Sequence, residues 1–283
     1  MEIYIQKRSP VIRWIVAAVL ALCFVAELIL ILNDRTAVID GSVFTVFQNI
    51  RDPFVTIIAK GVTFCANTAT IAGLCAILLI LPTRIRFGIP LTSVVCISAG
   101  CHYLLKEIIE RVRPDEVHHL VTVSGFGFPS GHANAGLVFY LFLMVLLRRY
   151  LILHDYKGIA YLLSAFLPVL VFAIGVSRVY LGVHYPSDVV GGWLLGGTLF
   201  IAFVTLYDAF YPIKYRLHYA PPAWEAMRKK RAWRRPSHVG KETQLIEFPK
   251  NRTPWRREVI PEKRRREKER ETSAPNRRTE TGE

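Results

Sequence analysis

Six apolar stretches constrain this chain more than any other feature, because each approaches the roughly 20 residues that a helix needs to cross a bilayer. They lie at residues 14–33, within 61–82, within 87–105, at 133–147, at 158–177 and at 189–207. Hydrophobic residues make up 52% of the 283 residues, which is unusual for a soluble chain of this length. The sequence therefore predicts an all-α membrane protein, a six-transmembrane-helix bundle.

The segment between the first two stretches, residues 34–60, alternates apolar and charged side chains. Phe44 and Phe47 stand close to Asp40, Arg51 and Asp52. This mixture predicts one or two short amphipathic helices at the membrane interface.

Basic residues orient the predicted spans. They precede the first stretch, separate the second from the third and the fourth from the fifth, and follow the sixth; those before residue 212 are Lys7, Arg8, Arg13, Arg84, Arg86, Arg148, Arg149 and Lys157. Six crossings place all four groups on one side, which the positive-inside rule makes cytoplasmic. Both termini are then expected in the cytoplasm, and segments 34–60, 106–128 and 178–188 on the opposite face.

The C-terminal residues 212–283 form a separate basic tail in this prediction. They hold 21 of the 36 Lys and Arg and 10 of the 22 Asp and Glu, a net charge of +11 out of +14. With repeated prolines and no continuous apolar face, the tail is expected to be mostly disordered. It could bind anionic lipid at the inner leaflet or simply be solvated, and a basic tail behind a membrane domain (residues 1–211) does not indicate nucleic acid.

The first cluster of polar residues closes the third stretch. Lys106 and Arg113 are seven residues apart, two helical turns, so the spacing predicts that they share a helix face before Pro114 ends the helix. Two cations at a membrane boundary suit either phosphate binding or snorkelling toward lipid headgroups.

The second cluster, Pro129 with Ser130, Gly131 and His132, opens the fourth stretch. A glycine-rich approach brings free backbone N–H groups to a helix N-terminus, which favours an anion. The alternatives are that Ser130 simply caps the helix and that His132 is an ordinary interfacial histidine.

The third cluster links the fifth and sixth stretches. The guanidinium of Arg178 suits bidentate phosphate binding. If a helical turn joins His184 and Asp188, the carboxylate can hold one ring nitrogen and leave the other free, as a nucleophile in covalent catalysis requires. The alternative is a loop hydrogen bond that fixes the turn at Pro186.

All three clusters fall on the same predicted face of the membrane. Three cations, a glycine-rich helix start, two histidines and a carboxylate therefore converge on one place. Their convergence also explains why basic residues occur in loops on the extracytoplasmic side, since an anionic ligand would need them.

The three clusters resemble the tripartite signature of the type 2 phosphatidic acid phosphatase superfamily, which includes lipid phosphate phosphatases and vanadium haloperoxidases. The pattern K-x6-R-P, P-S-G-H and S-R-x5-H-x3-D is complete here and in order, within residues 10–210. The membrane context is typical of a bacterial six-span member, in the inner (plasma) membrane.

The resemblance implies a role for each matched residue. His184 would attack phosphorus and form a phosphohistidine, Asp188 would orient it, and His132 would protonate the leaving oxygen. The phosphoryl oxygens would be held by the remaining positions, Lys106, Arg113, Ser130, Gly131 and Arg178. These cations would neutralise charge without a metal or another cofactor.

The expected activity is hydrolysis of a phosphomonoester or pyrophosphate of a membrane lipid, such as undecaprenyl pyrophosphate or a phosphatidate-like lipid. A phosphotransferase that passes the phosphoryl group to an acceptor other than water would share every catalytic residue. A non-enzymatic transporter is the other alternative, but it would place charges at the bilayer midplane, and Glu27 lies toward the outer end of its stretch.

Overall fold

The described part of this computed structural model, residues 10–218, contains helices and no strand, which confirms the predicted all-α class. The elements are α1 (Pro10–Leu32), α2 (Ala37–Asn49), α3 (Pro53–Phe64), α4 (Thr68–Ile80), the π-helical turn η1 (Arg84–Gly88), α5 (Ile89–Ile109), the 3-10 turn η2 (Glu116–His118), α6 (Gly131–Leu153), α7 (Lys157–Tyr180) and α8 (Pro186–His218).

Five helical segments of 22 to 26 residues are apolar and long enough to cross a membrane. The pair α3 and α4 passes the same test when taken together, with a bend of 42° between its halves, and supplies a sixth crossing if it is one span. The outer faces of these helices carry large exposed apolar side chains, for example Leu22 on α1 and Phe172 on α7. Such surfaces are unfavourable in water and suit lipid, so the chain is an integral membrane protein.

The second crossing differs from the sequence prediction. The apolar pattern placed it within 61–82, whereas the helix already begins at Pro53, where the side chain of Asp52 accepts hydrogen bonds from the N–H groups of Phe54 (2.8 Å) and Val55 (3.1 Å). The break falls where Asn67 caps α4 by accepting from the Ala69 N–H at 3.3 Å. The expected interfacial segment therefore holds one separate short helix, α2, and most of α3, which packs against α7.

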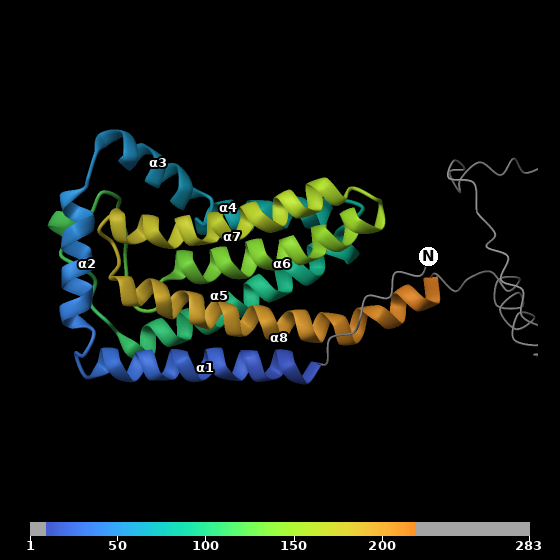
Figure 1. Cartoon of the computed structure of the whole chain (residues 1–283), viewed down its shortest axis with the longest axis horizontal. Coiled ribbons are helices and arrows are strands. Elements are labelled where there is room, and N and C mark those ends of the chain that lie inside the picture. The colour runs from blue at the N-terminus through green and yellow to red at the C-terminus, as the bar shows by residue number, and fades with distance from the viewer. Residues whose placement is uncertain (1–9, 219–283) are drawn as a thin grey trace, which may run out of the picture. The chain divides into compact units, whose positions relative to one another are not determined.

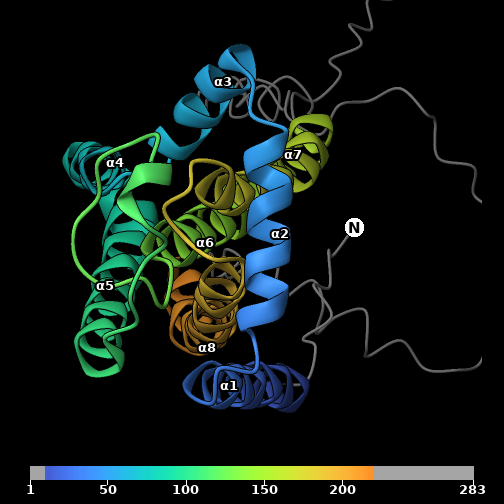
Figure 2. The ribbon, with the colours of Figure 1, turned by 90° about the vertical axis from the view of Figure 1, so that its left-hand side faces the viewer.

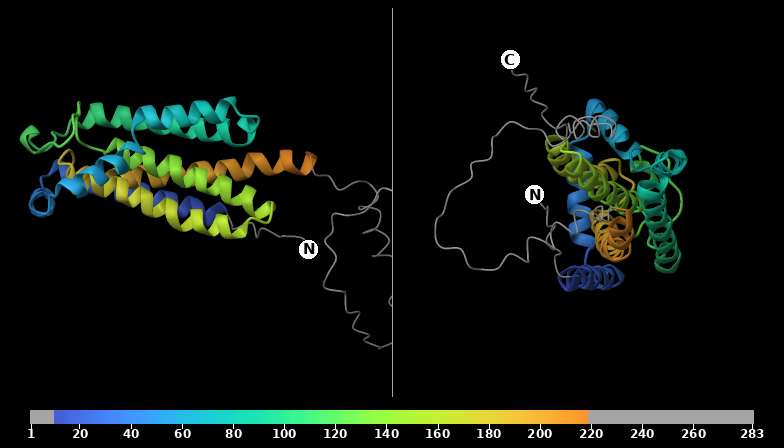
Figure 3. Two further views of the ribbon diagram at one scale, coloured as in Figure 1. Left: turned by 90° about the horizontal axis from the view of Figure 1, so that it is seen from above. Right: turned by 90° about the vertical axis from the view of Figure 1, so that its right-hand side faces the viewer.

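Helix α2 lies across one end of the bundle, roughly perpendicular to the long helices (Figure 1). Figure 2 looks onto that end, where α2 passes in front of α6, α7 and α8. Helix α8 packs between α1 and α6, as the end view in Figure 3 also shows. Loops that are far apart in the sequence thus meet beneath α2.

Helix α6 forms the centre of the bundle and packs against α5, α7 and α8. Its side chains Val138, Phe139 and Phe142 are almost fully buried, together with Leu91 of α5 and Ile174 of α7. This apolar core fixes the start of α6 relative to its neighbours.

Two glycines let α8 approach the backbone of α6. A Cβ at Gly196 would stand 3.1 Å from the Asn134 carbonyl oxygen, and one at Gly192 would stand 2.6 Å from that of Ser130. Small residues four apart on a transmembrane helix allow such close packing. The approach brings the first turn of α8 beside the first turn of α6, where the Ser130 N–H donates to the Asp188 carbonyl at 2.8 Å.

The opposite end of the bundle is held by a shared carboxylate. Asp208 of α8 pairs with Arg13 of α1 and with Arg149 of α6. Helix α8 continues to His218, past the expected domain boundary between residues 211 and 212. The rest of the expected tail, residues 219–283, lies outside the described residues.

Candidate active site

His184 lies in the turn between α7 and α8 and is 1% exposed. Its Nδ1 is 3.3 Å from Oδ2 of Asp188 in the first turn of α8, and the same oxygen accepts the Tyr185 N–H at 2.9 Å. Pro186 begins α8, and this provides the helical turn between His184 and Asp188 on which the sequence-based interpretation depended. The carboxylate therefore holds one ring nitrogen of the histidine, as expected from the four-residue spacing.

Arg113 faces the other ring nitrogen. Its Nη1 is 3.0 Å from Nε2 of His184 and donates to the Val183 carbonyl at 2.8 Å. Its Nε donates to the Gly125 carbonyl at 2.8 Å, and Nη2 to that of Ser124 at 3.3 Å. Backbone carbonyls from two loops thus fix the guanidinium beside the histidine.

These contacts define the tautomer of His184. A guanidinium can only donate, so Nε2 must accept and the ring proton is on Nδ1, facing Asp188. Burial lowers the pKa of His184 well below its usual value, and the cations Arg113, Arg178 and Lys106 lower it further. The imidazole is neutral, with a lone pair on Nε2 directed toward the arginine side of the site.

The expected shared helix face of Lys106 and Arg113 is wrong. Helix α5 ends at Ile109, because Glu110 adopts a left-handed conformation with φ 50° and turns the chain. Arg113 lies in the following loop, which folds back so that the Gly127 N–H donates to the Arg111 carbonyl at 2.6 Å. The two cations still come to the same region, Lys106 from the last turn of α5 and Arg113 from the loop.

Ser130 precedes α6, but its side chain makes no capping hydrogen bond. Its hydroxyl is buried and has no hydrogen-bond partner among the described residues. An orphaned buried hydroxyl is costly unless a ligand satisfies it. The capping alternative raised by the sequence is therefore excluded, and the anion-binding interpretation gains support.

Arg178, in the last turn of α7, is 2% exposed. Its Nη1 donates to the hydroxyl of Thr63 on α3 at 2.9 Å, while its Nε is buried and finds no partner in residues 10–218. A buried guanidinium with an unused donor is a ready site for an anion.

His132, in the first turn of α6, lies within electrostatic range of Arg178, His184, Arg113 and Lys106. The backbone of Gly131 beside it lies close to His102, since a Cβ there would stand 3.0 Å from the His102 ring. The structure thus brings the sequence-predicted residues of all three clusters together at the end of the bundle that α2 covers.

Four residues at the site were missed by the sequence analysis. His102 of α5 hydrogen-bonds through Nε2 with the Pro129 carbonyl at 3.1 Å, and Thr63 contacts Arg178. Arg111 pairs both with Asp188 and with the fourth residue, Asp40. Arg111 is two residues from Arg113, and its charge at a membrane boundary was a usable signal. Asp40 gave no such signal, because it lies 147 positions away from Ser187, with which it forms a hydrogen bond.

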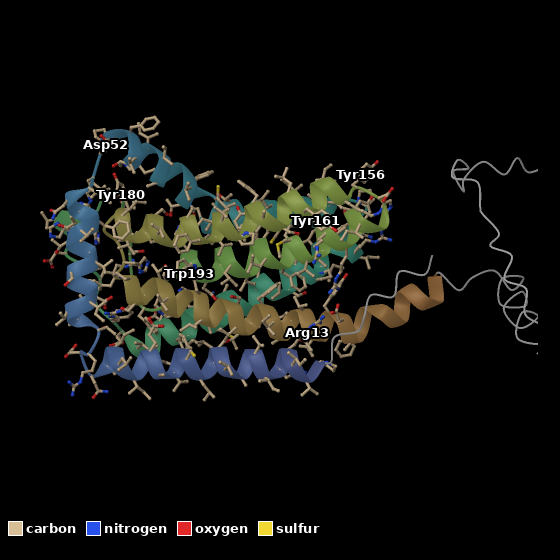
Figure 4. The ribbon with its side chains drawn as sticks, viewed as in Figure 1. Arg13, Asp52, Tyr156, Tyr161, Tyr180 and Trp193 are labelled. Atoms are coloured by element: carbon tan, nitrogen blue, oxygen red, sulfur yellow. The ribbon has the colours of Figure 1, made fainter. Side chains whose placement is uncertain are left out.

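A second group of contacts fastens this end of the bundle. The Tyr180 hydroxyl of α7 accepts the Asp52 N–H at 2.9 Å and donates to the Asp52 carbonyl at 3.0 Å, and Figure 4 labels both residues at the α2 end. Arg51 donates to the carbonyls of Tyr180 (3.2 Å) and His118 (2.9 Å). These bonds tie the loop before α3 to the loops that carry the site.

Within the described residues, no group of three or more His, Cys, Asp or Glu side chains is arranged to hold a metal ion. The absence of a metal requirement, which the resemblance implies, stays a prediction.

A helical bundle with spans long enough to cross a membrane, and with cations clustered around a buried histidine, defines the class as an integral membrane protein with a cationic site suited to an anion. Residues 87–212, which include all three clusters, match the PAP2 superfamily.

The chain is also similar to named phosphatases. The chain is 47% identical over 98 residues to phosphatidylglycerophosphatase B of Bacillus subtilis (strain 168), covering 34% of this chain and 46% of that protein. It is 28% identical over 176 residues to a lipid A 4'-phosphatase of Bacteroides thetaiotaomicron, covering 56% and 72%. The match thus spans less than half the length of the first relative.

A solved structure shares the fold. The crystal structure of a transmembrane PAP2 type phosphatidylglycerolphosphate phosphatase from Bacillus subtilis superposes with a TM-score of 0.62 at 29% identity. The superposition covers 69% of this chain and 96% of that one.

Proposed function

We propose that this protein is a lipid phosphatase that hydrolyses a phosphomonoester or pyrophosphate of a membrane lipid through a phosphohistidine at His184. The observation that carries the proposal is the environment of His184, a neutral imidazole whose Nδ1 faces Asp188 and whose Nε2 faces Arg113. A nucleophile, its orienting carboxylate and a fixed cation beside the attacking atom are the elements of covalent phosphoryl transfer.

In the first step, Nε2 of His184 attacks phosphorus, a P–N bond forms, and the bond between phosphorus and the lipid oxygen breaks. Arg113 and Arg178 with Lys106 neutralise the charge on the phosphoryl oxygens, and the unpartnered Ser130 hydroxyl donates to one of them. The proton on Nδ1 stays between His184 and Asp188, so the carboxylate stabilises the positive charge that the ring gains.

His132 completes this step by giving a proton to the departing lipid oxygen. The bound phosphate brings negative charge beside this histidine, which favours its protonated form. In the second step His132 takes a proton from water, the water oxygen attacks phosphorus, and the P–N bond breaks. Inorganic phosphate leaves, and His184 returns to its neutral state.

The location of the site supports a lipid substrate. The polar residues of the site lie at the α2 end of a bundle whose flanks are apolar, so a headgroup can reach them while its tail stays in the bilayer. Undecaprenyl pyrophosphate or a phosphatidate-like lipid fits this arrangement. The names of the relatives, which include lipid A and dolichyl diphosphate phosphatases, support a lipid phosphate without selecting one.

We infer further that the site faces away from the cytoplasm. Arg13 and Arg149 lie at the end opposite α2, as do the basic residues of η1, and the positive-inside rule assigns that end to the cytoplasm. Phosphate would then be released outside the cytoplasm, as the recycling of a carrier lipid requires.

Phosphate release from purified lipids in detergent tests the proposal. The panel contains undecaprenyl pyrophosphate, phosphatidylglycerol phosphate, phosphatidate and a lipid A phosphate. We expect release from at least one of them, and loss of that activity by more than about a thousandfold in His184→Ala. The control His154→Ala, whose exposed ring contacts Tyr150 at its own helix end, should keep wild-type activity. Turnover of any of these lipids by His184→Ala at the wild-type rate would disprove the mechanism.

A further inference from the structure

The carboxylate of Asp188 has a second partner besides His184. Its Oδ1 accepts a hydrogen bond from Nη1 of Arg111 at 2.6 Å, and its side chain is fully buried. The same Nη1 donates to the hydroxyl of Ser187 at 2.7 Å. One oxygen of Asp188 is thus fixed by an arginine, which leaves the other directed at the histidine and at the Tyr185 N–H.

Arg111 is in turn fixed by Asp40 of α2, which is 2% exposed. Oδ2 of Asp40 accepts from Nη2 of Arg111 at 2.7 Å and from the Ser187 hydroxyl at 2.6 Å, and Oδ1 accepts the Ser187 N–H at 3.0 Å. The four side chains close a network that joins α2, the loop after α5 and the first turn of α8.

The charges of this network distinguish Arg111 from the phosphate-binding cations. Both terminal nitrogens of its guanidinium are bound to carboxylates, and its plane also lies over the Tyr185 ring, 5.2 Å from the centroid. Burial alone would lower the pKa of Arg111, but the carboxylates of Asp188 and Asp40 outweigh burial and raise it. Arg113 and Arg178 bond neutral groups instead, so their charge is available to a phosphate.

We propose that Arg111 and Asp40 are positioning residues, which orient Asp188 and through it the nucleophile His184, and that α2 thereby becomes part of the catalytic apparatus. The inference rests on the proposed function. It assigns no contact between Arg111 and the substrate, so the pair acts on the rate of the chemical step and not on the binding of phosphate.

The test compares kcat and KM of Arg111→Gln, Arg111→Lys and Asp40→Asn in detergent, with the best lipid from the panel. Loss of a group that orients a catalytic residue typically costs about 10- to 100-fold. We expect kcat to fall about 100-fold in Arg111→Gln and about 10-fold in Asp40→Asn, with KM within about threefold of wild type. Arg111→Lys keeps the charge but cannot bridge both carboxylates, so it should fall between the wild type and Arg111→Gln.

A matched control comes from the other end of the bundle, where Arg13 is labelled in Figure 4. There Asp208 is shared by two arginines, so Arg149→Gln also removes an arginine from an ion-pair network between helices. This variant should lose thermal stability without a change in kcat measured well below the unfolding temperature. The contrast separates positioning from a general loss of packing.

A double-mutant cycle with Asp188→Asn gives the second readout. Because Arg111 acts through the Asp188 carboxylate, adding Arg111→Gln to Asp188→Asn should lower the residual kcat less than threefold. This loss is far smaller than the loss expected if the two substitutions acted independently. Three results would overturn the inference: a raised KM with unchanged kcat in Arg111→Gln, an unchanged kcat in Asp40→Asn, or an additive cycle. If Arg111→Gln does not fold, the Asp40→Asn result decides. Failure of the proposed function is distinguishable, since it would appear as an active His184→Ala.

Discussion

Replacing Asp188 with asparagine changes one atom of the side chain and tests the orientation of His184. Oδ1 of Asp188 accepts from Arg111 at 2.6 Å, so in the variant the amide oxygen must take that position. The amide NH2 then stands where Oδ2 stood, facing Nδ1 of His184 and the Tyr185 N–H. Nδ1 is forced to accept, the ring proton moves to Nε2, and the lone pair that attacks phosphorus is lost.

The size of the effect follows from these contacts. The same change in the serine protease triad, where the wrong tautomer also results, costs about 10⁴ in kcat, and we expect a loss of about 10³ to 10⁴ here. The two donors brought face to face, NH2 and the Tyr185 N–H, should also destabilise the fold by about 1–3 kcal/mol. The reverse orientation of the amide would place its NH2 against Arg111 and is no better.

Phosphate release under saturating lipid measures kcat, and thermal unfolding in detergent shows whether the variant is folded at the assay temperature. The control is Asp155→Asn, which changes an exposed carboxylate in the turn between α6 and α7 and should leave kcat unchanged. A kcat of Asp188→Asn within tenfold of wild type, in folded protein, would refute the tautomer argument.

Four further predictions concern the metal, the pH dependence, the orientation and the tail. Activity should survive chelation of divalent metals and be inhibited by vanadate, which mimics the trigonal-bipyramidal phosphoryl group of the transition state. A loss of activity in chelator that magnesium restores would contradict the charge-neutralising role of the cations. Burial lowers the pKa of His184, so the unfolded chain takes up a proton near pH 6.5 that the folded chain does not. The unfolding temperature should therefore fall as the pH drops below about 6.5, and it should fall less in His184→Gln. Equal falls in both proteins would show that this histidine is not the cause. In a cysteine-free background, Glu116→Cys should react with a membrane-impermeant thiol reagent in intact cells, and labelling only after the membrane is opened would put the site in the cytoplasm. Truncation after Ala220 should leave hydrolysis of a soluble short-chain substrate intact, and a folded but inactive truncation would show that the tail takes part in the chemistry.

The sequence by itself determined the helical class, the apolar segments of the five to six candidate crossings, and the residues that meet at one end of the bundle. These features are local: a bilayer requires about 20 apolar residues for each helix, and loops at alternate ends of successive spans must share a face. The pairing of His184 with Asp188 was equally accessible, because four residues and a proline that starts a helix fix the geometry within one turn. The clusters could therefore be placed at one end of the bundle without coordinates.

Other features were decided only by tertiary structure. The sequence predicted a common helix face for Lys106 and Arg113, but the left-handed Glu110 ends α5 early, and the loop that carries Arg113 is fixed by carbonyls of residues 124, 125 and 183. The unsatisfied hydroxyl of Ser130 likewise depends on what surrounds it. No spacing rule predicts a hydrogen bond whose acceptor lies in a different loop.

The network around Asp188 is the clearest case. Asp40 reaches Arg111 and Ser187 because α2 crosses the end of the bundle and because Gly192 and Gly196 let α8 approach α6. A buried carboxylate is stable only where the fold supplies its partners, and these come from segments 71 and 147 residues away along the chain. The sequence thus identified the groups to which we assign the proposed chemistry, whereas the packing of α2 and α8 determined which side chains hold them in place.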